Sequence, residues 1–561
     1  MKDVTDTQGR NAPAGIPTAA IWRLEDTYIP FLVAAGMLLL LLLVGQKFWL
    51  TNDDIRMAMT VGGYGIAAAP SPGLVIDNSV VWGWLLMHVP DVAGIRGYTI
   101  ATYTLLLFSL IAIFTAVRRL RAPPFLAAAV LLCMYGGVVL YPQFTLLSGY
   151  LAAAGFALVL ASDGGNLRRS MAAAGPLLLL SGLIRPDEMA LVFIVACPFL
   201  LYAWRAHPDT RWRLHWLGLA VACAALLAGA FLYTQHYSST GAWTEFHDID
   251  GPRGEFTDYH LGSYFLAHQD QLAGGPISAN DIKLLYSFFY VDPAVFNSRN
   301  VDPLINSVTL TDRYALNSDR SELFFSVFMD HELQLMLALF LVFAVLNWRR
   351  PAPEAASLLL LLALMLAIGL WGRPGVLRIY VPAAAAMMTL ALLKLGPRRG
   401  PPTLILGVVA LLSALGLCGE FQLHARSDAI YANHARAIVC ASVPKDQLLV
   451  VWTGGGIFDW KDIYRPTTRD DDACNPPLYA IGTYQLAPPS LARLHAYTGG
   501  LDFIDALLAG HVFHITTSEA RLKMLDRYLQ EHYRASLHWT EVKEESRLEI
   551  YTIQASPVGT P

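Results

Sequence analysis

Carboxylates and arginines stand at the ends of long apolar segments of this chain. Asp53 and Asp54 directly follow the first segment, Arg185 lies between two later ones, and Arg373 and Arg378 precede another. A carboxylate can take a proton from a hydroxyl group, and a guanidinium group binds two phosphate oxygens side by side. Together these residues predict proton removal next to a bound phosphate.

The acidic pair supplies the candidate base. Neighbouring side chains on a helix or strand point in different directions, so only one of Asp53 and Asp54 is expected to face the site. The sequence favours Asp53 slightly but does not separate the two. The arginines are the candidates for holding the phosphate of a donor. Four further residues near the segment ends are expected to support the site: Gln143, Asp187, Glu188 and Tyr380.

The composition places most of the chain in a membrane. Of the 561 residues, 55% are hydrophobic and 15% are charged, and the mean hydropathy is +0.43. A soluble domain carries roughly 25% charged residues, so a soluble enzyme, a disordered chain and a coiled coil are all excluded. We expect membrane lipid as a partner and no nucleic acid.

Eleven segments are long and apolar enough to cross a bilayer as helices. A membrane helix needs roughly 20 mostly apolar residues, because each backbone amide must be satisfied within the helix. The fold class is therefore a polytopic α-helical membrane protein of about eleven spans. The segments cover residues 28–50, 98–116, 124–141, 144–161, 171–184, 189–204, 215–233, 333–348, 355–371, 379–395 and 402–417.

Basic residues set the expected orientation. The arginine and lysine clusters at 118–121, 168–169, 205–213, 349–350 and 394–399 fall in alternate connections. Basic loops stay in the cytoplasm, which predicts a cytoplasmic N-terminal tail, residues 1–27. The membrane domain is then 28–419, with outer loops at 51–97 and 237–328, and residues 420–561 form an extracytoplasmic domain. Two amphipathic stretches of the first outer loop, 54–64 and 78–87, are expected to lie along the bilayer surface.

The C-terminal segment reads as an α/β domain. Buried strands are expected at 447–452 and 512–516, and a hairpin over 537–553. Helical patterns occupy 489–497, 503–508 and 518–533. Cys440 and Cys474 are the two cysteines of this domain, and an oxidising compartment would allow them to form a disulfide.

The second outer loop holds a weak candidate for a metal site. Glu245, His247, Asp248 and Asp250 carry oxygen and nitrogen ligands of the kind that divalent cations use. Their spacing matches no defined metal motif, and solvated acidity is the default interpretation. No cofactor is certain, and a divalent cation is the one that the sequence allows.

Short motifs around these residues resemble the GT-C glycosyltransferases that use sugars linked to a polyprenyl phosphate. The motifs are Asp53-Asp54 after the first span, Arg185-Pro186-Asp187 between later spans, and Arg378-x-Tyr380-x-Pro382. Bacterial arabinofuranosyl- and mannosyltransferases of the cell envelope are similar in carrying an external C-terminal domain. The resemblance implies that the aspartate of the first outer loop is the catalytic base. It also implies that Asp187, Glu188 and the arginines shape the donor site, although many relatives have glycine at the position of Glu188.

The sequence thus predicts an inverting glycosyltransferase of a bacterial inner membrane. A polyprenyl-phosphate sugar would be the donor, and an envelope glycan, lipid or protein the acceptor. Two alternatives stay open: a polysaccharide polymerase or ligase that uses diphosphate-linked oligosaccharides, and a non-enzymatic transporter or flippase of lipid-linked sugars. Sugar, acceptor and linkage are not specified by the sequence.

Overall fold

The structure is a computed structural model of the whole chain. It describes residues 18–73, 78–163, 165–207, 209–241, 243–318, 325–373, 375–397, 401–452, 464–466, 476–545 and 548–557.

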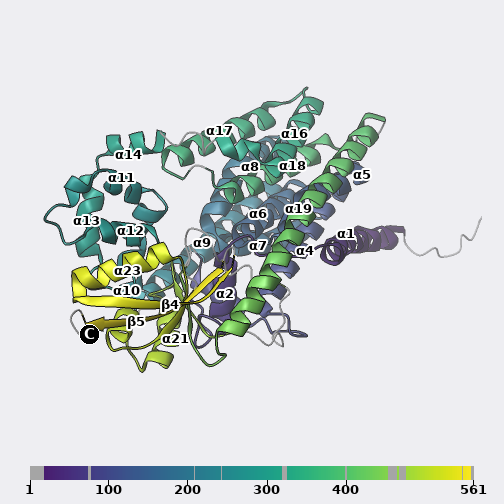
Figure 1. Cartoon of the computed structure of the whole chain (residues 1–561). Helices are drawn as coiled ribbons and strands as arrows, with labels where there is room; N and C mark the ends of the chain where they lie inside the picture. Colours follow the sequence, from purple (N-terminus) through teal and green to yellow (C-terminus); the bar gives the residue numbers. More distant parts are fainter. Residues whose placement is uncertain are drawn as a thin grey trace, which may run out of the picture.

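A bundle of apolar helices forms the membrane part (Figure 1). Among the described residues, seven helices are long and apolar enough to cross a membrane, and four shorter apolar helices, of which the first is the Tyr28–Val44 part of α1, accompany them. These eleven helices match the eleven predicted spans, so the polytopic helical class is confirmed. They are α1 (Thr18–Val44), α4 (Gly97–Arg119), α5 (Pro124–Leu140), α6 (Phe144–Leu160), α7 (Leu167–Ile184), α8 (Pro186–Ala206), α9 (Thr210–Ser238), α16 (His331–Leu346), α17 (Ala352–Leu370), α18 (Leu377–Leu395) and α19 (Pro401–Ser442).

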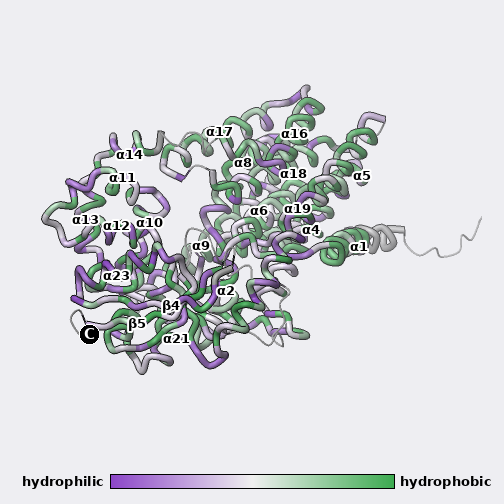
Figure 2. Tube along the Cα trace, in the orientation of Figure 1, coloured by the Kyte–Doolittle hydropathy of each residue, from purple (hydrophilic) through white to green (hydrophobic). Residues whose placement is uncertain are grey.

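The central helices are buried on all sides, whereas the outer ones present apolar side chains outward. α6 is buried along nearly its whole length, and α9 exposes large residues such as Leu217, Phe231 and Leu232. The hydropathy colouring in Figure 2 shows the hydrophobic residues on the bundle helices. An outward apolar surface of this kind is what a lipid environment requires.

Basic residues of alternate connections meet at one end of the bundle. Arg119 at the end of α4 donates a hydrogen bond of 2.6 Å to Ser170 in α7. Lys394 at the end of α18 pairs at 2.6 Å with Glu354 at the start of α17. Asp53, Arg185 and Arg378 belong to the connections at the opposite end, as the alternation of spans requires.

The first outer loop contains two short helices, α2 (Asn52–Gly62) and α3 (Val80–Met87). All residues of α2 from Asp54 to Val61 are buried. The expectation that α2 lies along the bilayer surface is therefore wrong, because its apolar residues are buried within the protein, and the C-terminal domain contacts α2 and the residues that follow it. The amide of Leu478 donates to the carbonyl of Gly65 at 3.2 Å, and the Arg56 guanidinium lies 5.7 Å from the ring centre of Tyr484.

The second outer loop is largely helical. Its helices are α10 (Trp243–Thr257), α11 (Leu261–Ala267), α12 (Ala279–Tyr286), α13 (Ser298–Ser307) and α14 (Leu310–Ser318), with 3₁₀ helices at Gln269–Leu272 and Val327–Met329. The sequence identified this region only by its acidity. The apolar side chains that define its core, such as Phe246, Ile249, Phe256 and Phe265, are fully buried.

The C-terminal region is a five-stranded mixed sheet with the order β2-β1-β3-β5-β4. β1 runs parallel to β2 and β3, while β5 runs antiparallel to β3 and β4. The predicted strands, hairpin and helices all form, which confirms the C-terminal α/β region. Its elements are β1 (Leu449–Trp452), β2 (Leu478–Ile481), α21 (Pro488–Thr498), α22 (Phe503–Leu508), β3 (Phe513–Thr516), α23 (Glu519–Tyr533), β4 (Ala535–Glu545) and β5 (Leu548–Pro557).

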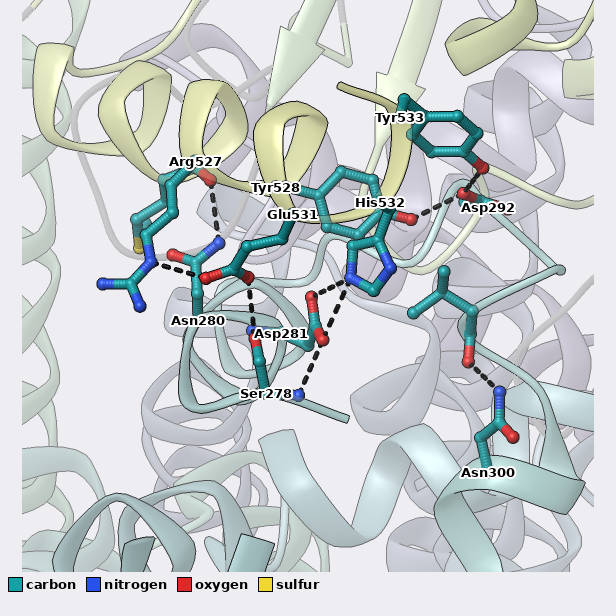
Figure 3. A network of polar contacts seen from close by, with 12 residues as sticks. Ser278, Asn280, Asp281, Asp292, Asn300, Arg527, Tyr528, Glu531, His532 and Tyr533 are labelled. Carbon is teal, nitrogen blue, oxygen red and sulfur yellow. Dashed lines mark hydrogen bonds and ion pairs between the residues drawn. The ribbon is translucent and has the colours of Figure 1, made fainter. Parts of the chain in front are cut away.

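A polar network joins this domain to the second outer loop (Figure 3). Asp292 accepts hydrogen bonds from the hydroxyl groups of Tyr528, at 2.6 Å, and Tyr533. Burial, followed by the Asp292 carboxylate, raises the pKa of Tyr528, so its hydroxyl keeps its proton and remains a donor. His532 of α23 lies 3.1 Å from Asp281 of α12. The network fixes α23 on α12 and thereby holds the sheet over the outer end of the bundle.

The last apolar helix, α19, continues without a break from Pro401 to Ser442. It therefore crosses residue 420, and the domain boundary drawn there stays a prediction. Cys440 near its end is disulfide-bonded, whereas Cys133, Cys197, Cys223 and Cys418 are free. Cys474, the predicted partner, lies outside the described residues, so this pairing also stays a prediction.

Candidate active site

The chain enters the site through an extended segment between α1 and α2. The amide of Phe48 donates to the carbonyl of Leu140 at 3.0 Å, and that of Leu50 to Pro142 at 3.2 Å. Gly45 allows this approach, because a Cβ there would overlap Gln422 and Leu140. The start of α2 is thus fixed against the outer ends of α5 and α6.

Asp54 points into the protein and is fully buried. Its Oδ1 accepts hydrogen bonds from the Tyr98 hydroxyl at 2.8 Å and from the Phe144 amide at 3.0 Å, and its Oδ2 accepts one from Thr51 at 3.2 Å. Burial raises the pKa of Asp54 to about 8, assisted by the charge of Asp53 and opposed by these hydrogen bonds. Asp54 therefore anchors α2 to α4 and α6 and has no open side toward a substrate.

Replacement of Asp54 tests this anchoring role. Asp54→Ala leaves two buried donors without their acceptor, and each costs about 1–3 kcal/mol, so we expect a lower Tm in detergent or nanodiscs. Asp54→Asn keeps an acceptor oxygen and should stay near the wild-type Tm at neutral pH.

The pH dependence gives a second readout of the same carboxyl group. Because the folded-state pKa is raised from 3.8 to about 8, the folded protein binds more protons between those values. The resulting stabilisation is complete below about pH 4 and is lost as the pH rises through about 8. Asp54→Asn should remove this dependence of the Tm on pH. An unchanged dependence would contradict a raised pKa of Asp54.

Asp53 faces the other way and remains partly open. Its side chain is 18% exposed and lies 3.8 Å from Arg56 and 3.6 Å from Arg378. Both distances exceed those of a charge-assisted hydrogen bond, which are about 2.7–2.9 Å. The carboxylate is thus held between two guanidinium groups while its oxygens stay available to a hydroxyl group. This geometry separates the acidic pair that the sequence left open.

Arg378 lies at the start of α18 and lines a cavity of about 770 Å³. Most of the wall is apolar, with Leu146, Val381 and Phe421 among its residues. Leu50 and Thr51, which precede Asp53 by a few residues, also line it. Arg378 interacts electrostatically with Asp53, Asp54, Arg185 and Arg373. The charged residues of the site therefore gather beside an apolar cavity large enough for part of a lipid.

Arg185 is 8% exposed and is held by α6. Its guanidinium donates to the Thr145 hydroxyl at 3.3 Å and lies 5.4 Å from the ring centre of Phe144. Gln143 is buried and accepts hydrogen bonds from the amides of Thr145 and Leu146 at the start of α6. Gln143 thus orders the turn that positions Arg185.

The other predicted residues occupy different surroundings. Arg373 pairs with Asp258 at 3.2 Å and lies 5.5 Å from the ring centre of Tyr259, so the second outer loop holds it. Asp187 is exposed in the first turn of α8. The structure therefore brings Arg373 near Arg378 but places Asp187 away from the buried part of the site.

Two of the predicted site residues have a buried polar atom without a hydrogen bond among the described residues. These atoms are Oε1 of Glu188, which is 2% exposed, and the hydroxyl of Tyr380, which is fully buried. Glu188 packs against α6 at Gly149, where a Cβ would lie 3.1 Å from its Oε1. Both residues lie inside the bundle, where an unpartnered polar group is costly.

The weak metal candidates of the second outer loop do not form a site. Asp248 accepts hydrogen bonds from the hydroxyl and amide of Ser298, and Asp250 pairs with Arg253 at 2.7 Å. Neither Glu245 nor His247 joins them within the 4.8 Å that a shared ion requires. Burial raises the pKa of Glu245 and lowers that of His247, which disfavours the charged form of each.

Sequence reasoning missed three residues of this site: Arg56, Tyr98 and Glu332. Arg56 follows Asp53 by three positions, which is the spacing of an ion pair on a helix. Tyr98 and Glu332 stand at the ends of apolar spans, and their sequence surroundings give no sign of their contacts.

Fold and site together define a polytopic helical membrane protein with a site of carboxylates and arginines beside an apolar cavity at one end of the bundle. No protein-family model and no curated protein sequence matches the chain. Two crystal structures of ArnT from Cupriavidus metallidurans align with 95% of this chain and 98% of theirs. The one bound to undecaprenyl phosphate has 13% identity and a TM-score of 0.36, and the apo state has 12% and 0.41. At such values the similarity carries no argument about this chain, and its function is inferred from the residues above.

Proposed function

We propose that the protein is an inverting glycosyltransferase that takes a sugar from a polyprenyl phosphate. The observation that carries this proposal is the Asp53 carboxylate, held between Arg56 and Arg378 beside the apolar cavity. The cavity suits a lipid chain, and the arginines suit the phosphate at its head. The acceptor is an envelope glycan, lipid or protein.

Asp53 and the two arginines have different roles in the proposed reaction. Asp53 takes the proton of the acceptor hydroxyl, and the oxygen attacks the anomeric carbon of the donor sugar. The bond from that carbon to the phosphate oxygen breaks, and the polyprenyl phosphate leaves with the electron pair. Arg378 and Arg56 stabilise the charge that develops on the departing phosphate. A single displacement inverts the anomeric configuration.

We also propose an orientation of the chain in the membrane. The arginine and lysine clusters at the end opposite to Asp53 support a cytoplasmic location of that end, because basic loops stay in the cytoplasm. The N-terminus is then cytoplasmic, and the C-terminal domain, with Cys440 in a disulfide, lies on the oxidising side of a bacterial inner membrane.

Donor specificity tests the function directly. Purified protein should carry a polyprenyl phosphate that mass spectrometry detects, and it should transfer sugar from a monophosphate-linked donor. Asp53→Asn protein prepared in the same way should bind the lipid but form far less product. Transfer from diphosphate-linked oligosaccharides alone would replace the proposal with a polymerase or ligase. Lipid binding without transfer from either donor would favour a transporter.

A further inference from the structure

The cavity beside Arg378 contains a carboxyl group that the proposed reaction leaves unused. Glu332 lies in the first turn of α16, is 9% exposed and lines the cavity. No hydrogen bond or ion pair of its carboxyl group is found among the described residues. A buried carboxyl group without partners is costly, so the wall of an apolar cavity is an unfavourable place for it.

The other carboxylates of this cavity are already engaged. Asp330 caps α16 by accepting a hydrogen bond from the Leu333 amide at 2.9 Å. Asp428 accepts one from the Tyr141 hydroxyl at 3.3 Å. Because Asp330 caps the helix, Glu332 is not needed for that purpose.

The neighbouring helix is shaped to admit the Glu332 side chain. Gly137 of α5 also lines the cavity, and a Cβ there would lie only 2.6 Å from Oε1 of Glu332. Any other residue at this position would displace the carboxyl group. The absence of a side chain at Gly137 therefore keeps Glu332 in place along the cavity wall.

We propose that Glu332 is a specificity-determining residue that accepts a hydrogen bond from a hydroxyl or amino group on the donor sugar. This inference rests on the proposed function. Arg378 and Glu332 line the same cavity, from the first turns of two helices that pack together, α18 and α16. A phosphate-linked sugar carries its anionic group on the anomeric carbon and its hydroxyl or amino groups on other carbons of the same ring, so one molecule can contact both residues.

Lipid binding by the full-length protein in nanodiscs tests the role of Glu332. The probes are undecaprenyl phosphate, undecaprenyl phosphate glucose and an undecaprenyl phosphate aminopentose. We expect the wild type to bind one sugar-bearing lipid at least about tenfold more tightly than the sugar-free lipid, the effect of one hydrogen bond to a charged group. Glu332→Met should remove this preference and leave the affinity for undecaprenyl phosphate within about twofold.

Three further variants test whether the preference depends on the Glu332 carboxyl group. Gly137→Ala displaces the carboxyl group without removing it and should reduce the same preference. Glu420→Gln is the matched control, because Glu420 pairs with His331 at the start of α16 and is not part of the cavity wall. Retention of the preference in Glu332→Gln identifies a hydroxyl group as the donor, and its loss identifies an amino group.

The possible failures are distinguishable. If the wild type prefers no sugar-bearing lipid, or if Glu332→Met keeps the preference, the role of Glu332 is overturned while the proposed function stands. If no probe binds to the wild type, the proposed function itself is overturned. Size-exclusion profiles and Tm values confirm that each variant is folded.

Discussion

Asp53→Asn is expected to reduce sugar transfer by about 10²–10⁴-fold, the usual contribution of a general base. Asparagine has nearly the same size, and the replaced carboxylate makes only long contacts with Arg56 and Arg378. The variant should therefore fold, reach the membrane and bind the lipid donor. Turnover of purified protein with a radiolabelled donor measures the loss.

Asp270→Asn provides the matched control for Asp53. Asp270 is an exposed carboxylate in the 3₁₀ helix of the second outer loop, remote from the cavity wall. Its replacement should leave turnover unchanged. Full activity of Asp53→Asn, with the loss appearing in Asp54→Asn instead, would exchange the roles that we propose for the two residues.

The second large effect is expected at Arg378. A hydrogen bond to a charged group contributes about 1.5–3 kcal/mol, so Arg378→Ala should weaken binding of undecaprenyl phosphate by about 10–100-fold. Arg378→Lys should restore only part of the affinity, because an ammonium group cannot make the paired contacts of a guanidinium group. Isothermal titration or native mass spectrometry in nanodiscs measures the change.

Arg350→Ala is the control for Arg378. Arg350 lies at the opposite end of the bundle, where its guanidinium donates to the Tyr202 hydroxyl at 3.2 Å. Its removal should not alter lipid affinity. An equal loss in both variants would mean that Arg378 acts through general folding or insertion and does not contact the phosphate.

Much of the architecture follows from composition and periodicity. The apolar spans and most strands are predicted because lipid and a sheet core impose clear patterns. The strand β2 was not predicted although it has the same four-residue length as β1 and β3, and its parallel pairing with β1 gives it its place in the sheet. The outer half of α19 has no glycine or proline between Glu420 and Ser442, which was a readable helix signal hidden by the change in polarity.

The residue types of the site could be predicted from the sequence, but the directions in which their side chains point could not. The sequence places Asp53 and Asp54 together, yet only the packing of α2 on α4 and α6 turns Asp54 inward. Arg373 has the same residue type as Arg378, but its side chain contacts Asp258 and Tyr259 of the second outer loop. Glu332 could not be identified from the sequence, because acidic residues are common at the start of a membrane span. The cavity that it lines is formed by helices that are distant from one another in the sequence.

The long helix α19 connects the membrane part to the C-terminal sheet. The helix has 42 residues and thus a length of about 63 Å at 1.5 Å per residue. Phe421, His424, Ser427 and Asp428 near its middle line the cavity, and its far end leads into β1. One unbroken helix therefore forms part of the cavity wall and also carries the chain to the first strand of the sheet.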